Sequence, residues 1–509
     1  MFAMLKWMLP LAGALLCAQA PADDLDRLPG SYRISAAPGS SLAIEPPVLP
    51  DLSGYNAGAL EAKIQRKPAG RALIKEMLHE DALDEFIGGK ERLREWVVRQ
   101  KRMPQAIFIE KGYLNSAELA RQLPKSAFAE TAPGVYLARL PIIVRPGATL
   151  HIDRTTKELR LSQEAGSFLV NDGRMFITGT RVTAWREKEG TPAFWRDGKE
   201  FRPYFLAWGG TETYVSDSVI TSFGYDASKA YGFSISQYSP SMTLKMKRSR
   251  PTGWLLNSRF IDMWYGFYCY EADDVVLRGN TYEHNIVYGI DPHDRSRRLI
   301  IAENQAFGTR KKHGIIISRE VNDSWIIGNK SYDNELSGIV IDRSSVNNLI
   351  ARNETYKNRA DGITLYESPH NLLWQNSSMN NQRHGIRVRN SVDVDLYENL
   401  LVANQLTGVY GHIKDLRGTD RDLHEDPFEA KVSLRIVGGQ MIGNGSSPIF
   451  VQSPSRLALY NLTILAPQKA SGITFSGLLG ARQGEIMEIL WRRQQAVLIE
   501  PLDSLASKE

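Results

Sequence analysis

Apolar and polar positions repeat with a constant period through the second half of the chain. An Asn recurs every 23 to 25 residues, and a Gly that precedes an alternating apolar segment recurs at the same interval. A fixed period of this length is typical of a solenoid, in which each repeat buries its apolar side against its neighbours. The repeated positions are Asn280, Asn304, Asn329, Asn353, Asn376 and Asn399, and Gly289, Gly314, Gly338, Gly362, Gly385 and Gly408.

The residues after each Gly alternate as in a strand with one buried face. The first and third residues are mostly Ile, Leu or Val, which predicts a dry core. The second and fourth residues face outward, and they form a ribbon across several coils because stacked coils lie about 4.8 Å apart. The outward positions are Asp291, Ile316, Val340, Thr364, Arg387 and Tyr410, and then His293, Ser318, Asp342, Tyr366, Arg389 and His412.

We interpret the Asn series as structural. Asn tolerates left-handed backbone at the corners of coils, and its amide can bond the backbone of the next coil. A second series, at Asn285, Asn334, Asn358, Asn381 and Asn404, is interpreted in the same way. Both series therefore predict corner ladders rather than catalytic groups.

The start of the chain predicts a signal peptide at residues 1–20. Lys6 precedes a short apolar run, and Ala18-Gln19-Ala20 offers a small-residue cleavage site. The apolar run is too short to favour a membrane anchor, and no later stretch is apolar enough to cross a bilayer. The mature chain keeps Cys269 but loses Cys17, so it can form no internal disulfide.

The rest of the chain predicts three regions. Residues 21–105 contain a Pro-rich extended segment and then a small helical region, from Ala57 to Lys101, that caps the solenoid or docks a partner. Residues 106–480 form the solenoid. Residues 481–509 form a cap, with a helix from Arg482 to Leu498, and a tail. The charged stretch from His412 to Ala430 interrupts the coils and predicts a surface loop or a flap over one face.

Composition is that of a globular protein, with 42% hydrophobic and 23% charged residues. The net charge of +5 becomes +4 without the leader. This mildly basic balance suits an anionic partner, but it does not separate a nucleic acid from an acidic polysaccharide. The predicted export of the chain argues against nucleic acid.

One coil departs from the apolar pattern and reads Asp291-Pro292-His293-Asp294. An isolated His is usually structural. Here two carboxylates flank it, and a carboxylate beside an imidazole fixes its tautomer and raises its basicity. His293 is therefore the candidate base, with Asp291 and Asp294 beside it. Metal binding would need a third ligand, and His313 in the next coil could be a second partner.

The outward ribbon combines Arg, His, Tyr and carboxylates. A long basic groove with aromatic residues suits an extended anionic chain such as a polyuronate, whereas the plainer alternative is a solvated sheet face with charges of both signs. The predicted substrate-binding residues are Lys312, Ser318, Asp342, Arg343, Tyr366, Arg387, Arg389, Tyr410 and His412.

The leader, the 23-to-25-residue Asn/Gly coil and the Asp291-Pro292-His293-Asp294 motif together resemble the periplasmic mannuronan C5-epimerases of alginate-producing bacteria. The similarity runs over nearly the whole chain. It implies an all-β fold, a right-handed parallel β-helix, and conversion of D-mannuronate to L-guluronate within the alginate polymer. It also implies that His293 faces C5 as the base, that Arg319 neutralises the substrate carboxylate, and that the partners are proteins of a periplasmic alginate export complex.

Strict alternation conflicts with one of these implied roles. It places Ser318, and not Arg319, on the face that carries His293. Arg319 lies at the predicted strand end, where alternation often breaks, and its side chain is long. We therefore keep Arg319 among the expected catalytic residues.

Two other functions fit the same pattern. A polyuronate lyase also begins by removing the C5 proton and then expels the C4 oxygen, and a non-catalytic alginate-binding scaffold would use the same groove. We expect no cofactor. We also expect no calcium requirement, because the sequence contains no Gly-Gly-x-Gly-x-Asp repeats.

Overall fold

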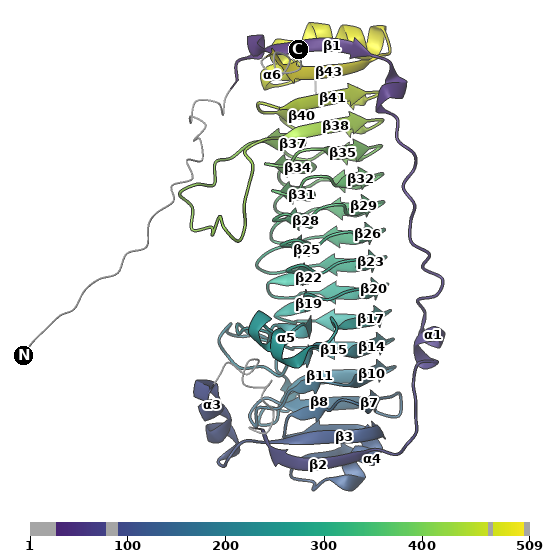
Figure 1. Cartoon of the computed structure of the whole chain (residues 1–509), viewed down its shortest axis with the longest axis vertical. Helices are drawn as coiled ribbons and strands as arrows, with labels where there is room; N and C mark the ends of the chain where they lie inside the picture. Colours follow the sequence, from purple (N-terminus) through teal and green to yellow (C-terminus); the bar gives the residue numbers. More distant parts are fainter. Residues whose placement is uncertain (1–26, 78–89, 467–471, 503–509) are drawn as a thin grey trace, which may run out of the picture.

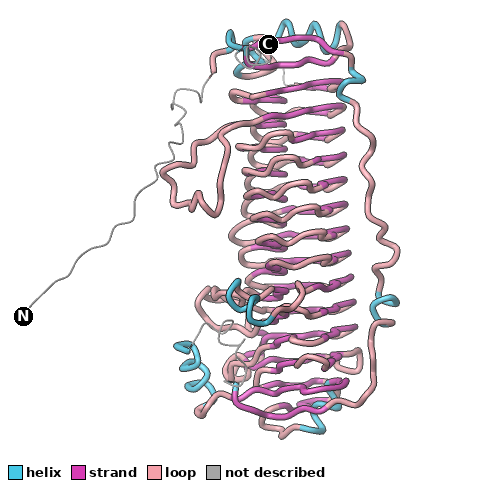
Figure 2. Tube along the Cα trace, viewed as in Figure 1, coloured by secondary structure: helices cyan, strands magenta, loops and turns pink. Residues whose placement is uncertain are grey.

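Coils of the chain stack into a long parallel β-helix with three rows of short strands (Figure 1). The computed structural model describes residues 27–77, 90–466 and 472–502, so the predicted signal peptide lies outside the described residues. Each coil passes through row 2, then row 3, then row 1, and strands of successive coils pair in parallel within a row. Figure 2 shows that strands and loops alternate regularly along the whole stack.

The rows are defined by their strands. Row 1 contains β6 (Ile142–Val144), β9 (Leu169–Asn171), β13 (Phe205–Ala207), β16 (Gly232–Ser236), β19 (Tyr265–Tyr270), β22 (Tyr288–His293), β25 (Ile315–Ser318), β28 (Ile339–Asp342), β31 (Ile363–Tyr366), β34 (Ile386–Arg389), β37 (Thr407–His412) and β40 (Ser447–Val451). Row 2 contains β7 (Ala148–Ile152), β10 (Arg174–Thr178), β14 (Glu212–Ser216), β17 (Thr252–Leu256), β20 (Val276–Arg278), β23 (Ile300–Ala302), β26 (Trp325–Ile327), β29 (Leu349–Ala351), β32 (Leu372–Trp374), β35 (Val394–Tyr397), β38 (Ser433–Val437) and β41 (Arg456–Tyr460). Row 3 contains β5 (Val135–Ala138), β8 (Glu158–Ser162), β11 (Arg181–Arg186), β15 (Val219–Thr221), β18 (Arg259–Ile261), β21 (Thr281–Glu283), β24 (Gln305–Phe307), β27 (Lys330–Tyr332), β30 (Glu354–Tyr356), β33 (Ser377–Met379), β36 (Leu400–Val402), β39 (Gln440–Ile442) and β42 (Thr463–Leu465).

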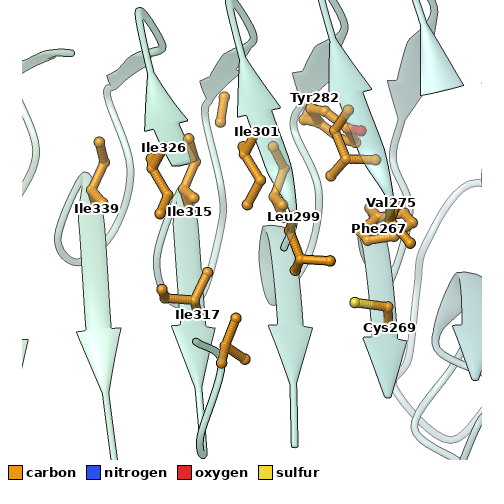
Figure 3. Packing of buried hydrophobic residues seen from close by; sticks show 14 of the residues in the cluster. Phe267, Cys269, Val275, Tyr282, Leu299, Ile301, Ile315, Ile317, Ile326 and Ile339 are labelled. Atoms are coloured by element: carbon orange, nitrogen blue, oxygen red, sulfur yellow. The ribbon is translucent and has the colours of Figure 1, made fainter. Parts of the chain in front are cut away.

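The core lies inside the stack and contains the inward residues that the repeat predicts. Ile315 and Ile317 of one coil pack beside Ile339 of the next, and Ile301 and Ile326 meet them from row 2 (Figure 3). All five are fully buried. Burial of one such side chain contributes roughly 1.5–3 kcal/mol relative to leaving it exposed. The fold expected from the sequence is thus confirmed.

Ladders of Asn side chains occupy the corners, as predicted. In the first ladder each Asn side-chain oxygen accepts from the backbone N–H of the Asn one coil earlier. Asn329 N–H, for example, donates to Asn353 Oδ1 at 2.9 Å. The Asn353 amide also donates to the carbonyl of Ile326 at 2.8 Å. The side chains of the first ladder are therefore all hydrogen-bonded, as the interior of a solenoid requires, whereas Asn285 Nδ2 of the second ladder has no partner among the described residues.

We expect Asn353→Ala to destabilise the fold by about 2–4 kcal/mol, because several buried polar groups then lose their hydrogen bonds at once. Thermal unfolding followed by circular dichroism measures the effect. Gln382→Ala, which removes an exposed amide from the outside of the stack, is the control and should leave the melting temperature unchanged. An unchanged melting temperature for Asn353→Ala would contradict a supporting role for the ladder.

The N-terminal segment reaches both ends of the solenoid. Strand β1 (Tyr32–Ala37) pairs antiparallel with β43 (Ala496–Pro501) at the C-terminal end. The chain then runs along the outside of the stack, past the short helix α1 (Ala57–Glu61), to the opposite end (Figure 1). Leu49, Leu52 and Tyr55 of this segment pack against outward apolar residues of row 2. The Pro-rich segment is extended, as expected.

The prediction of a helical region from Ala57 to Lys101 is only partly correct. Helices α1 and α3 (Lys90–Gln100) lie within it, but Arg71–Glu76 form strand β2. This strand pairs antiparallel with β3 (Gln105–Asn115), with Leu73 opposite Phe108. One edge of β3 offers backbone N–H and C=O groups that need partners. The hydrogen bonds that β2 forms with this edge outweigh the apolar spacing that locally favoured a helix. Helix α4 (Ser116–Gln122) and strand β4 (Phe128–Ala132) complete this end.

The predicted C-terminal helix ends earlier than expected. Helices α6 (Gly477–Ala481) and α7 (Gln483–Met487) and a π-helical turn at Glu488–Arg492 cover this end of the stack. Residues 496–498, predicted as helix, belong instead to β43, which pairs with both β41 and β1. The domain boundaries at residues 105 and 480 stay predictions. Among the helices that the structure describes, none is both long and apolar enough to span a membrane.

Candidate active site

A polar pocket of about 260 Å³ opens on the outer face of row 1, where β22 carries the sequence Asp291-Pro292-His293-Asp294. Five successive coils supply its walls. The structure therefore brings together six of the residues predicted from the sequence, and it adds four tyrosines and an isoleucine. The lining residues are Tyr231, Tyr265, Tyr268, Tyr288, Asp291, His293, Asp294, Ile316, Ser318, Asp342 and Arg343.

The strand register places the predicted ribbon in one line. His293 pairs with Ser318, and Ser318 pairs with Asp342. The line continues through Tyr366, Arg389 and His412 on the following coils. The ladder between β22 and β25 pairs Ile290 with Ile315 and His293 with Ser318 and skips the two positions between them, where Pro292 has no N–H to donate.

His293 points into the pocket with its imidazole tied to Asp294. Its Nδ1 bonds Asp294 Oδ2, so Nε2 is the nitrogen that remains to take a proton. Burial lowers the pKa of His293, but the hydrogen bond to Asp294 and the charge of Asp291 outweigh burial and raise this pKa above its usual value. Burial alone would raise the pKa of Asp294, but its hydrogen bond to His293 outweighs burial and holds this pKa below the usual range.

Arg319 is not among the residues that line the pocket, but its guanidinium lies beside Asp294, which does line it. Strand β25 ends at Ser318, and Arg319 has a left-handed φ of 63°. Asp294 and Arg343 occupy the same corner position one coil before and one coil after, with φ of 37° and 51°. The left-handed residue breaks the strand alternation, so Arg319 does not have to follow the outward face of Ser318, and its catalytic role stays a prediction. Arg319 Nη1 consequently lies 3.6 Å from Asp294 Oδ1.

Asp291 is the most enclosed carboxyl of the pocket, with 2% of its surface exposed. Its Oδ1 is buried and has no hydrogen-bond partner among the described residues. Burial raises the pKa of Asp291 to about 7, although the charges of His293 and Lys312 oppose this rise. Asp291 therefore stands near its titration point at neutral pH, while Asp294 remains ionised.

Four tyrosines were missed by reasoning from the sequence. Tyr231, Tyr265 and Tyr288 each directly precede the Gly of a coil, and their rings follow one another along the pocket wall at 4.7 and 5.0 Å between centroids. Burial and the charge of Asp291 raise the pKa of all three hydroxyls. The fourth, Tyr268, lies opposite Asp291 in the strand register. The recurring Tyr-Gly pair is the signal that could have revealed this wall.

The predicted binding residues farther along the groove already have partners in the protein. Arg389 makes two hydrogen bonds to the carboxylate of Glu367, at 2.7 and 3.0 Å. Arg387 bonds Tyr366 at 3.2 Å and His412 at 3.1 Å, and the ring of Tyr410 stacks on His412. This part of the groove is thus a connected network rather than a row of free cations.

The groove is bounded on two sides by polar contacts. Lys312 forms no ion pair with a carboxylate among the described residues, and its Nζ donates to the hydroxyl of Tyr288 at 3.0 Å. Ser318 donates to Asp342 at 3.1 Å.

On the other side, the loop at residues 413–432, between β37 and β38, reaches down beside the coils that carry the site (Figure 1). Its Asp426 binds the guanidinium of Arg319. The predicted interruption of the repeat is therefore a loop over this face.

A parallel β-helix with a carboxylate-flanked histidine in a polar pocket, and an arginine beside that carboxylate, suits a protein that acts on an acidic polysaccharide. Among the described residues, no group of three or more His, Cys, Asp or Glu is placed to hold a metal ion.

Comparison with known proteins identifies the family. The family model for the right-handed β-helix region matches residues 265–413. The chain is 61% identical to the mannuronan C5-epimerase AlgG of Azotobacter vinelandii over 94% of this chain and 91% of that protein. It is also 61% identical to the mannuronan C5-epimerase of Pseudomonas aeruginosa, over 94% and 88% of the two chains. The crystal structure of the periplasmic alginate epimerase AlgG superposes with a TM-score of 0.82 at 56% identity and covers 83% of this chain and 100% of that one.

The chain belongs to the mannuronan C5-epimerase family.

Proposed function

We propose that this protein is an isomerase of the periplasm that converts D-mannuronate to L-guluronate residues within the alginate polymer. Family membership over nearly the full length carries the activity. The observation that supports the chemistry is the pair of contacts that Asp294 makes, one with His293 in the pocket and one with Arg319 beside it. The roles of the individual residues, given below, are part of the proposal.

The reaction has to remove a proton from a carbon beside a carboxylate. The C5–H bond is very weakly acidic while that carboxylate keeps its full charge, because the electron pair left at C5 would delocalise into an already negative group. A guanidinium that forms two parallel hydrogen bonds with the carboxylate offsets this charge. Arg319 supplies the guanidinium, and Lys312 and Arg343 add positive charge nearby.

His293 Nε2 then takes the C5 proton, while Asp294 holds the opposite nitrogen and stabilises the imidazolium that forms. Return of a proton to the other face of C5 inverts the centre and gives L-guluronate. The ionised form of Asp291, whose pKa burial raises to about 7, adds negative charge close to the imidazolium. The tyrosine wall and the ribbon through Ser318, Asp342 and Tyr366 hold neighbouring sugar units.

Proton NMR of polymannuronate incubated with the protein tests this function directly. New guluronate signals, without the ultraviolet absorbance of unsaturated chain ends, are expected. Absorbance would identify a lyase, and binding without either change would identify a scaffold. The same reaction run with a chelator should proceed at an equal rate, since the Arg319 guanidinium rather than a metal ion neutralises the carboxylate. Association with a periplasmic alginate export complex is a further proposal, and co-purification with envelope proteins tests it.

Asp294→Asn should lower turnover on the order of 10- to 100-fold, because the base loses the group that orients it. It should also shift the acid limb of the pH profile to lower pH. The carboxylate of Asp294 raises the pKa of His293, so its loss lets the imidazole stay neutral in more acidic solution. The measurement is kcat/KM against pH for both proteins. An acid limb that does not move would show that Asp294 does not act on the catalytic base.

A further inference from the structure

The 413–432 loop places a carboxylate of the protein on the arginine that is expected to bind the carboxylate of the substrate. Asp426 Oδ1 accepts from Arg319 Nε at 3.0 Å, and Asp426 Oδ2 accepts from Arg319 Nη2 at 2.9 Å. Arg343 Nη1 lies 3.5 Å from the same carboxylate. Two parallel hydrogen bonds from one guanidinium are the geometry in which Arg binds a uronate carboxylate.

The contact between Asp426 and Arg319 is largely shielded from solvent on the Asp426 side. Asp426 is 5% exposed, although the loop residues around it are largely open to solvent. Its hydrogen bonds to Arg319 hold the pKa of this guanidinium above its usual value. The contact crosses 107 residues of sequence, so the fold and not local geometry brings it about.

The loop is also fastened at two other points. Arg421 Nη1 bonds Glu367 Oε2 at 2.6 Å, and Arg421 Nε bonds the backbone carbonyl of Asp426 at 2.9 Å. Nearer its start, the side chain of Asn390 bonds the backbone N–H and carbonyl of Lys414, both at 2.7 Å. Glu367 and Asn390 belong to the same corner series as Arg319, so the loop follows this series of corner residues along the stack.

The charge of the loop agrees with a role as a stand-in for an acidic polymer. Residues 413–432 contain six acidic and four basic residues in a chain that is basic overall. A loop carboxylate that binds a cation of the site competes with an anionic ligand for that cation. The contacts of Asp426 identify Arg319 as the cation for which the loop and the ligand compete.

The polymer and Asp426 cannot hold Arg319 in this way at the same time. Asp426 uses both Nε and Nη2, and the remaining nitrogen, Nη1, faces Asp294 at 3.6 Å. A guanidinium already compensated by a carboxylate also neutralises a second carboxylate poorly. The substrate must therefore displace Asp426 before C5 can be activated.

We propose that Asp426 is a built-in competitor for the substrate carboxylate, which occupies Arg319 when no polymer is bound and thereby sets the affinity and length requirement of the enzyme. This inference rests on the proposed function of Arg319. A single uronate replaces one carboxylate by another and gains little, whereas a longer chain adds contacts along the groove that the loop cannot match. The device favours polymer over short fragments and over free carboxylates.

Asp426→Asn removes the charge and keeps the shape. In a His293→Ala background, which prevents turnover, the Kd for an oligomannuronate measured by titration calorimetry should fall by about three- to tenfold, because the fraction of protein with an open site rises. In the otherwise unaltered enzyme, kcat/KM at low polymer concentration should rise by a similar factor, and the gain should be largest for short oligomers. Asp420→Asn, which removes an exposed acid from the same loop, should change neither quantity by more than about twofold.

A second variant guards against a local effect at Arg319. Arg421→Gln loosens the loop from Glu367 but keeps the charge of Asp426, and it should also lower the Kd, by a smaller factor. Weaker binding or a lower kcat/KM for Asp426→Asn would overturn the inference and make Asp426 a positioning residue for Arg319. That outcome is distinct from failure of the proposed function, in which the unaltered protein itself produces no guluronate.

Discussion

His293→Ala should reduce the rate of guluronate formation by about 10²- to 10⁴-fold, because it removes the base that takes the C5 proton. Binding of polymannuronate should survive, since the groove and its cations remain. The imidazole is tied through Nδ1 to Asp294 and fills part of a pocket that is open to solvent, so its loss should leave the fold intact. Initial rates by NMR and affinity by calorimetry, on the same preparation, separate the two effects.

A matched control comes from another histidine on the outside of the solenoid. His370 lies on the turn between β31 and β32, and its side chain is 54% exposed. His370→Ala should retain the full rate. If His293→Ala keeps even a tenth of the activity of the unaltered protein, another group takes the C5 proton and the assignment is wrong.

Arg319→Ala should lower kcat/KM on the order of 10²- to 10³-fold, because the substrate carboxylate keeps its charge and the C5 proton stays weakly acidic. The kcat/KM of Arg319→Lys should lie between the values of Arg319→Ala and the unaltered protein, since an ammonium keeps the charge but loses the two parallel hydrogen bonds. The loss should appear in kcat as well as in KM, because neutralisation matters most when charge develops at C5. Steady-state kinetics of both variants on polymannuronate measure these terms.

Arg359→Ala is the control for the loss of one positive charge. Arg359 is exposed and forms an ion pair with Glu335 on the outside of the stack, away from the residues that line the pocket. Its removal should leave kcat/KM unchanged. A near-normal rate for Arg319→Ala would move the neutralising role to Arg343 or Lys312.

Many residues of the site could be predicted from the alternation of inward and outward positions within each repeat. Once Gly289 and Gly314 define the register, His293 and Ser318 must lie on one outward line, and the structure pairs them directly. The alternation fails at the strand ends. Arg319 lies one residue beyond β25, and its left-handed backbone, which no period predicts, turns the side chain toward Asp294. The family resemblance, rather than the alternation, had placed this arginine in the site.

The sequence by itself determined the solenoid, its inward core, the Asn ladders and the coil that carries the histidine, because each follows from a local pattern repeated at a constant interval. Only the tertiary structure decided which groups from distant segments meet. It placed β1 beside β43, paired β2 with β3, assembled the tyrosine wall, and set Asp426 on Arg319. Such contacts depend on how loops and chain ends return to the stack, and a loop of irregular sequence carries no period from which its end point can be read.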